Sequence, residues 1–418
     1  MKSFLVLESL EGYLMALNDV VRNVSLLSMC QALAQTQMVL IFSVTTFIGA
    51  ALAPVVNFFG VPFSLATLPI TVQFTFMTLS TLPAALLMKK LGRANGFILF
   101  ILLGVLGIAV CLIALVYHDF ILFCIGSSLF GASAGSNQQF RFAAVDTADE
   151  ATRSKAVSLV LAGGVFAGIV GPTLSAWSFD LLAPVIYAGV FAVIMAMQII
   201  MVILLLFTNI PPPNKTELSG PTRSFWEIAS QPKFIVAVMS AMVGYGVMNF
   251  VMLATPLFMG SHPAHSFTFP DVNDVIMWHV LGMFAPSFFT GWLIKRYGDI
   301  NIITIGAIIS GISIAVNLTG DTLMHLRIAM ALVGLGWNFM FTGGTTLLLQ
   351  TYKPSEKAKV QGINDFFVFG TVAVCSLLAG GTYQSVGWSA VNLAAVPLLV
   401  LVLLAVIWLR GRRLPVTT

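Results

Sequence analysis

Charged side chains are scarce in this sequence of 418 residues. Asp, Glu, Lys and Arg together make up 9% of it, whereas a soluble domain carries roughly 25%. This deficit excludes a soluble enzyme, a disordered tail and a nucleic-acid-binding protein. Hydrophobic residues supply 58% of the chain and the mean hydropathy is +0.97. We therefore expect an integral membrane protein whose main surroundings are lipid.

The sequence also lacks the patterns that carry enzyme chemistry. Its four cysteines are scattered through apolar stretches without metal-ligand spacing, which is typical of small packing residues. There is no phosphate-binding glycine loop, so the chain encodes no drive by ATP. Since paired carboxylates and Ser-His-Asp sets are absent as well, we expect no enzyme, no metal and no cofactor.

Long apolar segments recur along the whole chain. A helix needs about 20 apolar residues to cross the hydrocarbon core of a bilayer. Twelve segments approach or exceed this length, which predicts an all-α integral membrane fold with 12 transmembrane helices. The segments are residues 25–52, 62–88, 95–116, 120–145, 155–177, 184–207, 233–259, 274–294, 301–318, 322–350, 359–383 and 389–409.

The basic residues test the number of spans. If the N-terminus is cytoplasmic, all of the 20 Lys and Arg residues except Arg327 lie in cytoplasmic loops, tails or helix ends. Such a bias is typical of membrane proteins. We expect a multi-pass protein of a bacterial-type plasma (inner) membrane with both termini cytoplasmic. Residues 1–23 are interpreted as a short helix on the membrane surface or as a frayed extension, and 410–418 as a tail.

The two halves of the chain resemble each other. Residues 85–93, after the second predicted span, are similar to residues 291–299, after the eighth, and both contain two adjacent basic residues followed closely by Gly. A repeat of about half the chain predicts two pseudo-symmetric six-helix bundles, at 24–208 and 233–409. The polar segment 209–232, which contains three consecutive prolines, is expected to be a cytoplasmic linker between them.

On these features the sequence resembles the major facilitator superfamily over nearly its whole length. Members carry a glycine- and arginine-containing loop after helix 2 and a weaker copy after helix 8. Here the second copy is better preserved, because Ala85 and Lys89 stand at the usual Gly and Asp positions of the first. The resemblance implies two rigid bundles rocking around a central cavity lined by helices 1, 4, 7 and 10. The matching loop positions are Gly92, Arg93, Gly291, Lys295, Arg296 and Gly298.

Uncharged polar and aromatic residues lie near the middle of several predicted spans. Polar groups are costly in lipid, so they tend to face the interior of a bundle or a water-filled cavity. Such a set suits a neutral planar solute that stacks on aromatic rings and is oriented by amides. Alternatively, the amides hold helices together. The candidate substrate-binding residues are Gln35, Tyr245, Asn249, Trp337 and Asn338.

Three ionisable residues lie clearly inside the predicted spans. Asp365 is a candidate proton-coupling carboxylate; alternatively it pairs with Arg141 across the two halves and locks an inner gate, or is hydrated from the cytoplasm. His279 titrates in the range of a proton site, although a solvated His at the outer mouth is the simpler interpretation.

These features predict a secondary transporter that moves a small organic solute by alternating access, with proton coupling as an option. A neutral cavity of aromatics and amides is similar to that of riboflavin importers of the superfamily, and riboflavin is the specific substrate we expect. A proton-driven multidrug exporter is the alternative, favoured by the Gly-Pro stretch at 162–172, although packing of helices by small residues is the preferred interpretation of that stretch. A non-transporting receptor or assembly subunit is the alternative from another class. The expected partners are the substrate, the bilayer and protons, with the protein acting as a monomer.

Overall fold

Helices dominate the computed structural model, which describes residues 2–58, 61–140, 143–144, 153–210, 222–261 and 266–412. The first half of the chain contains α1 (Lys2–Leu52), α2 (Leu68–Leu91), α3 (Arg93–Tyr117), α4 (Phe120–Asn137), α6 (Arg153–Ser178) and α7 (Ala188–Leu206). The second half contains α8 (Phe225–Ala229), α9 (Pro232–Gly260), α10 (Phe269–Phe284), α11 (Ser287–Tyr297), α12 (Asp299–Thr319), α13 (Leu323–Leu349), α14 (Lys357–Val386) and α15 (Trp388–Gly411).

The predicted all-α membrane fold is confirmed. Eleven spans among the described residues are long and apolar enough to cross a bilayer, and one of them is formed by α10 and α11 together. The fifth predicted segment, 155–177, lies within α6, a helix of 26 residues. Each of the twelve predicted segments therefore corresponds to a helix or to the pair α10–α11.

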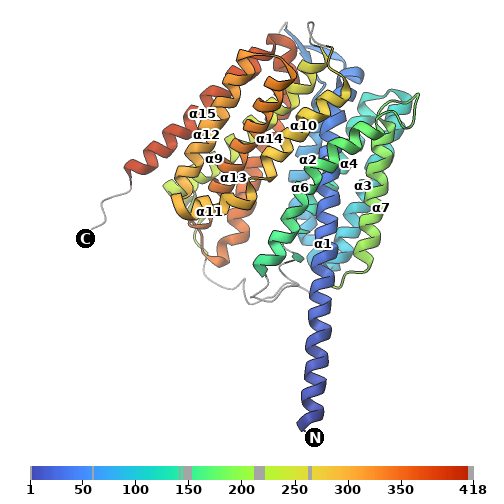
Figure 1. Ribbon diagram of the computed structural model, residues 1–418, viewed down its shortest axis with the longest axis vertical. Helices are drawn as coiled ribbons and strands as arrows, with labels where there is room; N and C mark the ends of the chain where they lie inside the picture. Colours follow the sequence, from blue (N-terminus) through green and yellow to red (C-terminus); the bar gives the residue numbers. More distant parts are fainter. Residues whose placement is uncertain are drawn as a thin grey trace.

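The helices form two halves that lie side by side, with α1 to α7 in one and α9 to α15 in the other (Figure 1). Each half has hydrophobic clusters of its own. A further cluster contains residues of both halves, including Phe74 of α2, Met248 of α9 and Trp337 of α13. This shared cluster joins the halves through their interior faces.

Close helix contacts recur at matching places in the two halves. A Cβ atom on Gly131 of α4 would lie 2.2 Å from the backbone oxygen of Gln73 on α2. A Cβ atom on Gly334 of α13 would lie 2.4 Å from the backbone oxygen of His279 on α10. Small residues allow helix backbones to approach this closely. The same kind of contact thus joins the second and fourth spans and the eighth and tenth, in agreement with the predicted repeat.

The second span begins later than predicted. Within the segment expected at 62–88, the chain first forms an antiparallel hairpin of β1 (Val55–Phe58) and β2 (Val61–Ser64), and α2 starts only at Leu68. Pro54 removes a backbone donor after α1, and the Val and Phe residues that follow favour strands. We call this end of the molecule the hairpin end, and the opposite end, where α7 ends at Leu206 and α8 begins at Phe225, the linker end.

Helix α1 extends well beyond the first predicted span. It begins at Lys2 and runs without a break for 51 residues. Residues 2–23 therefore continue the first transmembrane helix rather than forming a separate helix on the membrane surface. In Figure 1 this extension projects from the linker end.

Candidate functional site

Five aromatic rings from four helices meet between the spans of the second half. Tyr245 of α9 lies 5.3 Å from Trp337 of α13, 5.7 Å from Phe341 of α13 and 5.8 Å from Phe369 of α14, measured between ring centroids. The rings of Trp337 and Phe341 are stacked at 5.2 Å. Phe284 of α10 lies 6.1 Å from Trp337. We call these five residues the aromatic cluster.

The aromatic cluster lies at the boundary between the halves. Trp337 is buried, whereas the other four rings are partly exposed. Met38 and Phe42 of α1, which belong to the first half, pack against the same hydrophobic core as these rings. Gln35, a predicted site residue, is partly exposed. It shares a face of α1 with Met38 and Phe42, because residues three and seven positions apart lie on one side of a helix.

Asn249 lies one helical turn beyond Tyr245 on α9. Its amide nitrogen donates to Oγ of Ser376 on α14 at 2.7 Å and to the carbonyl oxygen of Val372 at 3.5 Å. Its Oδ1 atom is buried without a hydrogen-bond partner, and so is Nε1 of Trp337. One unpaired polar atom, Nε1 of Trp337, therefore belongs to the aromatic cluster, and the other, Oδ1 of Asn249, lies one helical turn from it.

Asn338 does not join the other predicted binding residues. Its amide nitrogen donates to the backbone oxygen of Met283 at 2.7 Å and to Oγ of Ser287 at 2.8 Å. Its Oδ1 atom accepts from Oγ1 of Thr290 at 2.7 Å. These bonds fasten α13 to α10 and α11 where that span is interrupted beside Pro286. For Asn338 the alternative interpretation, an amide that holds helices together, matches the contacts.

The predicted ionisable residues have different surroundings. His279 is fully buried, so the prediction of a solvated His at the outer mouth is wrong. Its Nδ1 lies 3.0 Å from the backbone oxygen of Met330, and its Nε2 has no partner. Because a carbonyl only accepts, Nδ1 carries the proton and Nε2 is bare. Asp365 is partly exposed and accepts from Nδ2 of Asn364 at 3.2 Å. Arg141 lies outside the described residues.

The two repeat loops show the same backbone geometry. Gly92 ends α2 with φ 84° and Gly298 ends α11 with φ 85°. Glycine adopts this region at little cost, which explains the residue type at both positions. Lys295 and Arg296 lie in the last turn of α11, and the guanidinium of Arg296 lies 5.4 Å from the ring of Trp292. Gly291 lies in α11, and Arg93 is the first residue of α3.

Aromatic contacts join the halves at the hairpin end. Phe269, the first residue of α10, lies 4.8 Å from Phe179, 5.5 Å from Tyr187 and 5.7 Å from Phe47 of the first half. A Cβ atom on Gly260 of α9 would lie 3.1 Å from the ring of Phe47. We call Phe47, Phe179, Tyr187 and Phe269 the hairpin-end seal. The sequence interpretation missed it.

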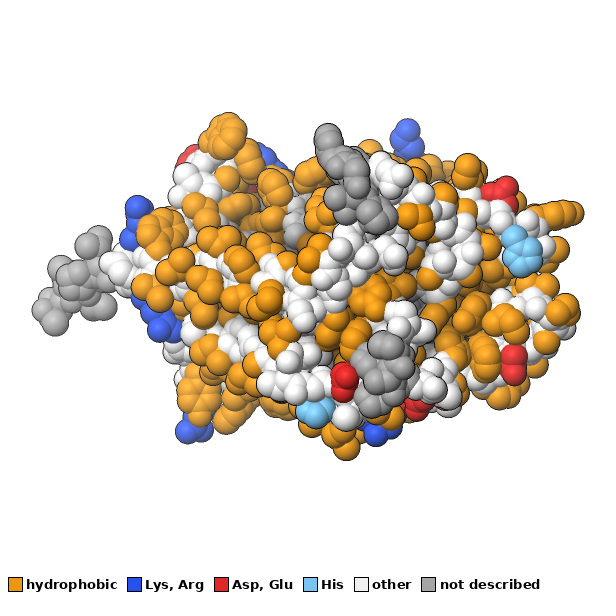
Figure 2. Space-filling model, turned by 90° about the horizontal axis from the view of Figure 1, so that it is seen from above, with side chains coloured by type: hydrophobic (Ala, Val, Ile, Leu, Met, Phe, Trp, Pro, Cys, Tyr) orange, Lys and Arg blue, Asp and Glu red, His pale blue; other side chains and the backbone are white. Residues whose placement is uncertain are grey.

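The hairpin itself adds a second contact between the halves. A Cβ atom on Gly381 of α14 would lie 1.8 Å from the ring of Phe63 on β2, so only glycine fits there. Thr67 donates to the backbone oxygen of Leu377 on α14 at 3.4 Å. Figure 2, which looks onto this end, shows hydrophobic side chains spread across it, with scattered acidic, basic and His side chains. The two halves are therefore packed together at the hairpin end.

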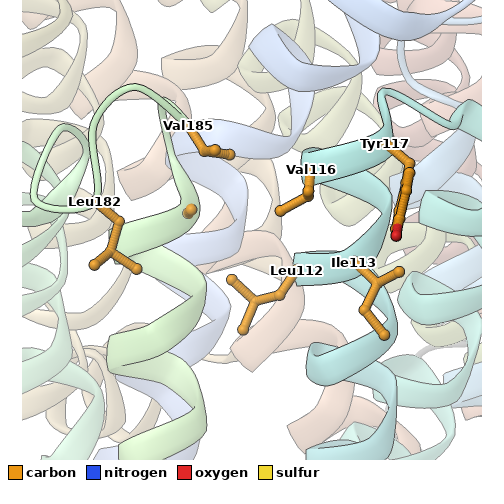
Figure 3. Close-up of a pocket in the computed structure, with 7 residues that line it drawn as sticks. Leu112, Ile113, Val116, Tyr117, Leu182 and Val185 are labelled. Atoms are coloured by element: carbon orange, nitrogen blue, oxygen red, sulfur yellow. The ribbon is translucent and has the colours of Figure 1, made fainter.

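An apolar pocket of about 310 Å³ lies between α3 and the connection from α6 to α7 (Figure 3). Val116 and Leu182 line it from opposite sides, and both are exposed on the surface of the molecule. None of its lining residues belongs to the aromatic cluster. Because its lining offers almost no polar atom to orient a solute, it does not have the character of a transport site.

Comparison with known proteins identifies the family. The family model of the Major Facilitator Superfamily matches residues 33–270 and 247–418. The chain belongs to the major facilitator superfamily. It is 35% identical over 390 residues to the riboflavin transporter RfnT of Brucella anthropi, covering 92% of this chain and 95% of that protein. It is 30% identical over 358 residues to the uncharacterised transporter YdeG of Bacillus subtilis, covering 80% of each chain.

Solved structures agree with this membership at the level of the fold. The nucleoside transporter NupG superposes with a TM-score of 0.67 at 15% identity, covering 92% of this chain and 99% of that one. The POT family transporter PepTSo superposes with a TM-score of 0.69 at 13% identity, covering 93% and 97%. This major facilitator protein is thus a multi-pass membrane transporter for a small molecule rather than an enzyme, a receptor or an assembly subunit.

Each end of the linker is hydrogen-bonded to its own half of this transporter. Asn209 exchanges two bonds with the side chain of Asn23 on α1, at 2.7 and 3.0 Å. Arg223 binds the carboxylate of Glu356 through Nε at 2.9 Å and through a terminal nitrogen at 2.6 Å. The Glu356 side chain is fully shielded from solvent, and it also accepts from the backbone nitrogen of Lys353 at 2.9 Å.

We expect the contact between Arg223 and Glu356 to make stability depend on pH. The hydrogen bonds from Arg223 and from the backbone nitrogen of Lys353 hold the pKa of Glu356 well below its usual range. The Glu356 carboxylate therefore contributes its full share to the free energy of unfolding above the ordinary carboxyl pKa of about 4.3. This contribution declines as the pH falls below that value. Glu356→Gln should lower Tm by about 2–4 °C at pH 7, with a much smaller difference at about pH 2, where most of the contribution is lost. Exposed Glu227→Gln is the control, and an equal effect at both pH values would contradict the assignment.

Proposed function

We propose that this transporter moves riboflavin across the plasma membrane by alternating access. The aromatic cluster carries this proposal, because a flat neutral ring system such as isoalloxazine stacks well on aromatic side chains. None of the five residues of the cluster is charged, which suits a neutral vitamin better than an anion. The 35% identity to a riboflavin transporter over most of both chains adds independent support.

The contacts between the halves support alternating access. The hairpin-end seal and the contact of Phe63 with Gly381 close the halves against each other at one end. The aromatic cluster lies deeper, near the middle of α9 and α13. A substrate that crosses the membrane must pass the hairpin end, so these contacts have to separate once in each cycle. The structure therefore corresponds, in this proposal, to a state closed at the hairpin end.

The orientation in the membrane follows from charge. Basic residues gather at the linker end, including Lys89 and Lys90 in the last turn of α2 and Lys295 and Arg296 in the last turn of α11. Cytoplasmic surfaces of membrane proteins carry such an excess. We therefore place the linker end and both termini on the cytoplasmic side of a bacterial-type inner membrane, and the seal on the outer side.

The Gly-Pro stretch that would favour a drug exporter is used for packing. A Cβ atom on Gly164 of α6 would lie 2.8 Å from the ring of Phe284 on α10. Cβ atoms on Gly168 and Gly171 would lie 3.0 Å from Val280 and 2.7 Å from Val39. These glycines bring α6 close to α10 and α1, so the stretch no longer favours the exporter over the vitamin transporter.

Binding of riboflavin to the purified protein tests the proposed function. Riboflavin is fluorescent, and stacking on aromatic rings quenches its emission. Titration with protein in detergent should give saturable quenching that unlabelled lumichrome, which shares the flat ring system, reverses. Thiamine, a cationic vitamin, should not compete. Saturable binding of thiamine or of many unrelated lipophilic compounds, without binding of riboflavin, would contradict the proposal.

Proton coupling makes a separate prediction at Asp365. Asp365→Asn should abolish uptake of riboflavin against a gradient but spare counterflow. An amide cannot bind and release a proton, so coupling is lost, whereas counterflow requires only that the protein alternate between its two open states. Both activities can be measured in proteoliposomes with and without an imposed pH gradient. His279→Asn is the matched comparison, since the bare Nε2 of His279 is the other candidate. Loss of both activities in Asp365→Asn would instead assign Asp365 to a gate.

A further inference from the structure

Two buried polar atoms beside the aromatic cluster have no hydrogen-bond partner. They are Nε1 of Trp337, a residue 7% exposed, and Oδ1 of Asn249, a residue 1% exposed. An indole nitrogen can only donate, and a side-chain carbonyl can only accept. Leaving such groups unpaired away from water costs free energy, so each one in a native protein calls for an explanation.

The hydrogen bonds around Asn249 fix which of its amide atoms is unpaired. Ser376 donates its own hydroxyl proton to the backbone oxygen of Val372 at 2.8 Å. The amide atom of Asn249 that faces this hydroxyl at 2.7 Å also lies 3.5 Å from the backbone oxygen of Val372, which can only accept, so this atom is the amide nitrogen. The carbonyl oxygen of Asn249 is left as a free acceptor.

The free donor and the free acceptor are close to the same rings. Asn249 follows Tyr245 by one turn and lies on the same face of α9. The ring of Tyr245 lies 5.3 Å from the ring of Trp337. Phe369 and Ser376 share a face of α14, and they contact Tyr245 and Asn249 respectively. A flat solute on the rings would thus have one donor and one acceptor at its edge.

We infer that Trp337 and Asn249 recognise the imide group of a neutral planar heteroaromatic solute by hydrogen bonding. In such a group a carbonyl lies next to a ring N–H. This assignment rests on the proposed function. In isoalloxazine the N3–H group lies between two carbonyl groups. Nε1 of Trp337 would donate to one of these carbonyls, and Oδ1 of Asn249 would accept from N3–H. The rings of the cluster supply stacking, and the two polar atoms supply specificity, because a solute without the imide leaves both unpaired.

Binding of riboflavin and of N3-methylriboflavin to the wild-type protein tests this assignment. The methyl group removes the only ring N–H of the imide and keeps the ring system and the ribityl chain. We expect N3-methylriboflavin to bind at least about tenfold more weakly, the usual result of leaving one buried polar group unpaired. Equal affinities would overturn the assignment and leave the proposed function standing. Absence of riboflavin binding would overturn both.

Substitutions at Asn249 and Trp337 test the roles of the two polar atoms one at a time. Asn249→Leu, which keeps the volume and removes the acceptor, should bring the affinity for riboflavin down to that for the N3-methyl compound. Trp337→Phe, which keeps a ring and removes the donor, should weaken both ligands by a similar factor. Asn317→Leu is the matched control: Asn317 is buried, is bonded to Asn392 and also has an unpaired Oδ1. This control should lower Tm and keep the discrimination between the ligands, and loss of discrimination in it would overturn the assignment.

Discussion

Trp337→Ala should weaken riboflavin binding about thirtyfold. Trp337 touches three rings of the aromatic cluster, Tyr245, Phe284 and Phe341, so its removal takes away the centre of the stacking surface. Stacking of a planar heterocycle on one aromatic side chain is worth about 1–3 kcal/mol, and about 2 kcal/mol corresponds to that factor. The measurement is a fluorescence titration of riboflavin with wild-type and variant protein.

The control for Trp337→Ala must also lower the folding stability of the protein. Removing a buried Trp costs about 3–5 kcal/mol of folding stability through the cavity it leaves. Trp388→Ala is the control, because the partly buried Trp388 stacks on Phe258 at 4.6 Å within the second half and outside the aromatic cluster. Both variants should melt at lower temperature, but only Trp337→Ala should lose affinity. Equal affinities for the two variants would remove Trp337 from the binding site.

Phe269→Ala should open the hairpin end. The Phe269 ring makes three aromatic contacts with the first half, and such pairs are each worth about 0.5–1.5 kcal/mol. Losing them should shift the balance toward the state open at this end by roughly tenfold or more. A cysteine at position 67 reports the shift, because Thr67 is fully buried beside α14. With the four native cysteines replaced by Ala, maleimide should label Thr67→Cys at least about tenfold faster in the Phe269→Ala background.

Phe258→Ala is the matched control for the seal. Phe258 is an aromatic residue near the end of α9, and its ring lies 4.6 Å from the ring of Trp388 and 6.5 Å from that of Tyr383, both in the same half. Its removal should destabilise the second half without separating the halves, so labelling at position 67 should stay slow. If Phe269→Ala and Phe258→Ala give the same labelling rate, the hairpin-end seal does not hold the halves together.

The spans and their repeat could be predicted because they depend on properties of the sequence alone. The length of an apolar segment and the charges of its flanking loops do not require knowledge of tertiary contacts. The same holds for Gly92 and Gly298, whose positive φ angles end helices at matching positions in the two halves. The hairpin at 55–64 was missed, because its Val and Phe residues are as apolar as the neighbouring helices.

The partners of individual side chains could be predicted only in part. Trp337 and Asn338 are neighbours in sequence, but successive helix residues point about 100° apart. They therefore face different helices, and only Trp337 belongs to the aromatic cluster. His279 was expected near solvent from its distance to the helix end, yet packing of α10 on α13 buries it completely.

The hairpin-end seal left no sequence signal. Its members Phe47, Phe179, Tyr187 and Phe269 are far apart along the chain, and their contacts form only when the halves meet. Phe is also abundant, with 33 residues in the chain, so no single one stands out. A structure was needed to find these contacts, whereas Tyr245 and Trp337 were already marked by their polar groups in the middle of spans.

Counterflow of riboflavin tests the central claim most directly. Proteoliposomes loaded with unlabelled riboflavin and diluted into labelled riboflavin should accumulate label transiently, because alternating access exchanges solute across the membrane without any other energy source. The accumulation should be absent from empty liposomes and strongly reduced by Trp337→Ala at substrate concentrations below the wild-type Kd. A folded, correctly inserted wild-type protein that gives no counterflow of riboflavin would contradict the account.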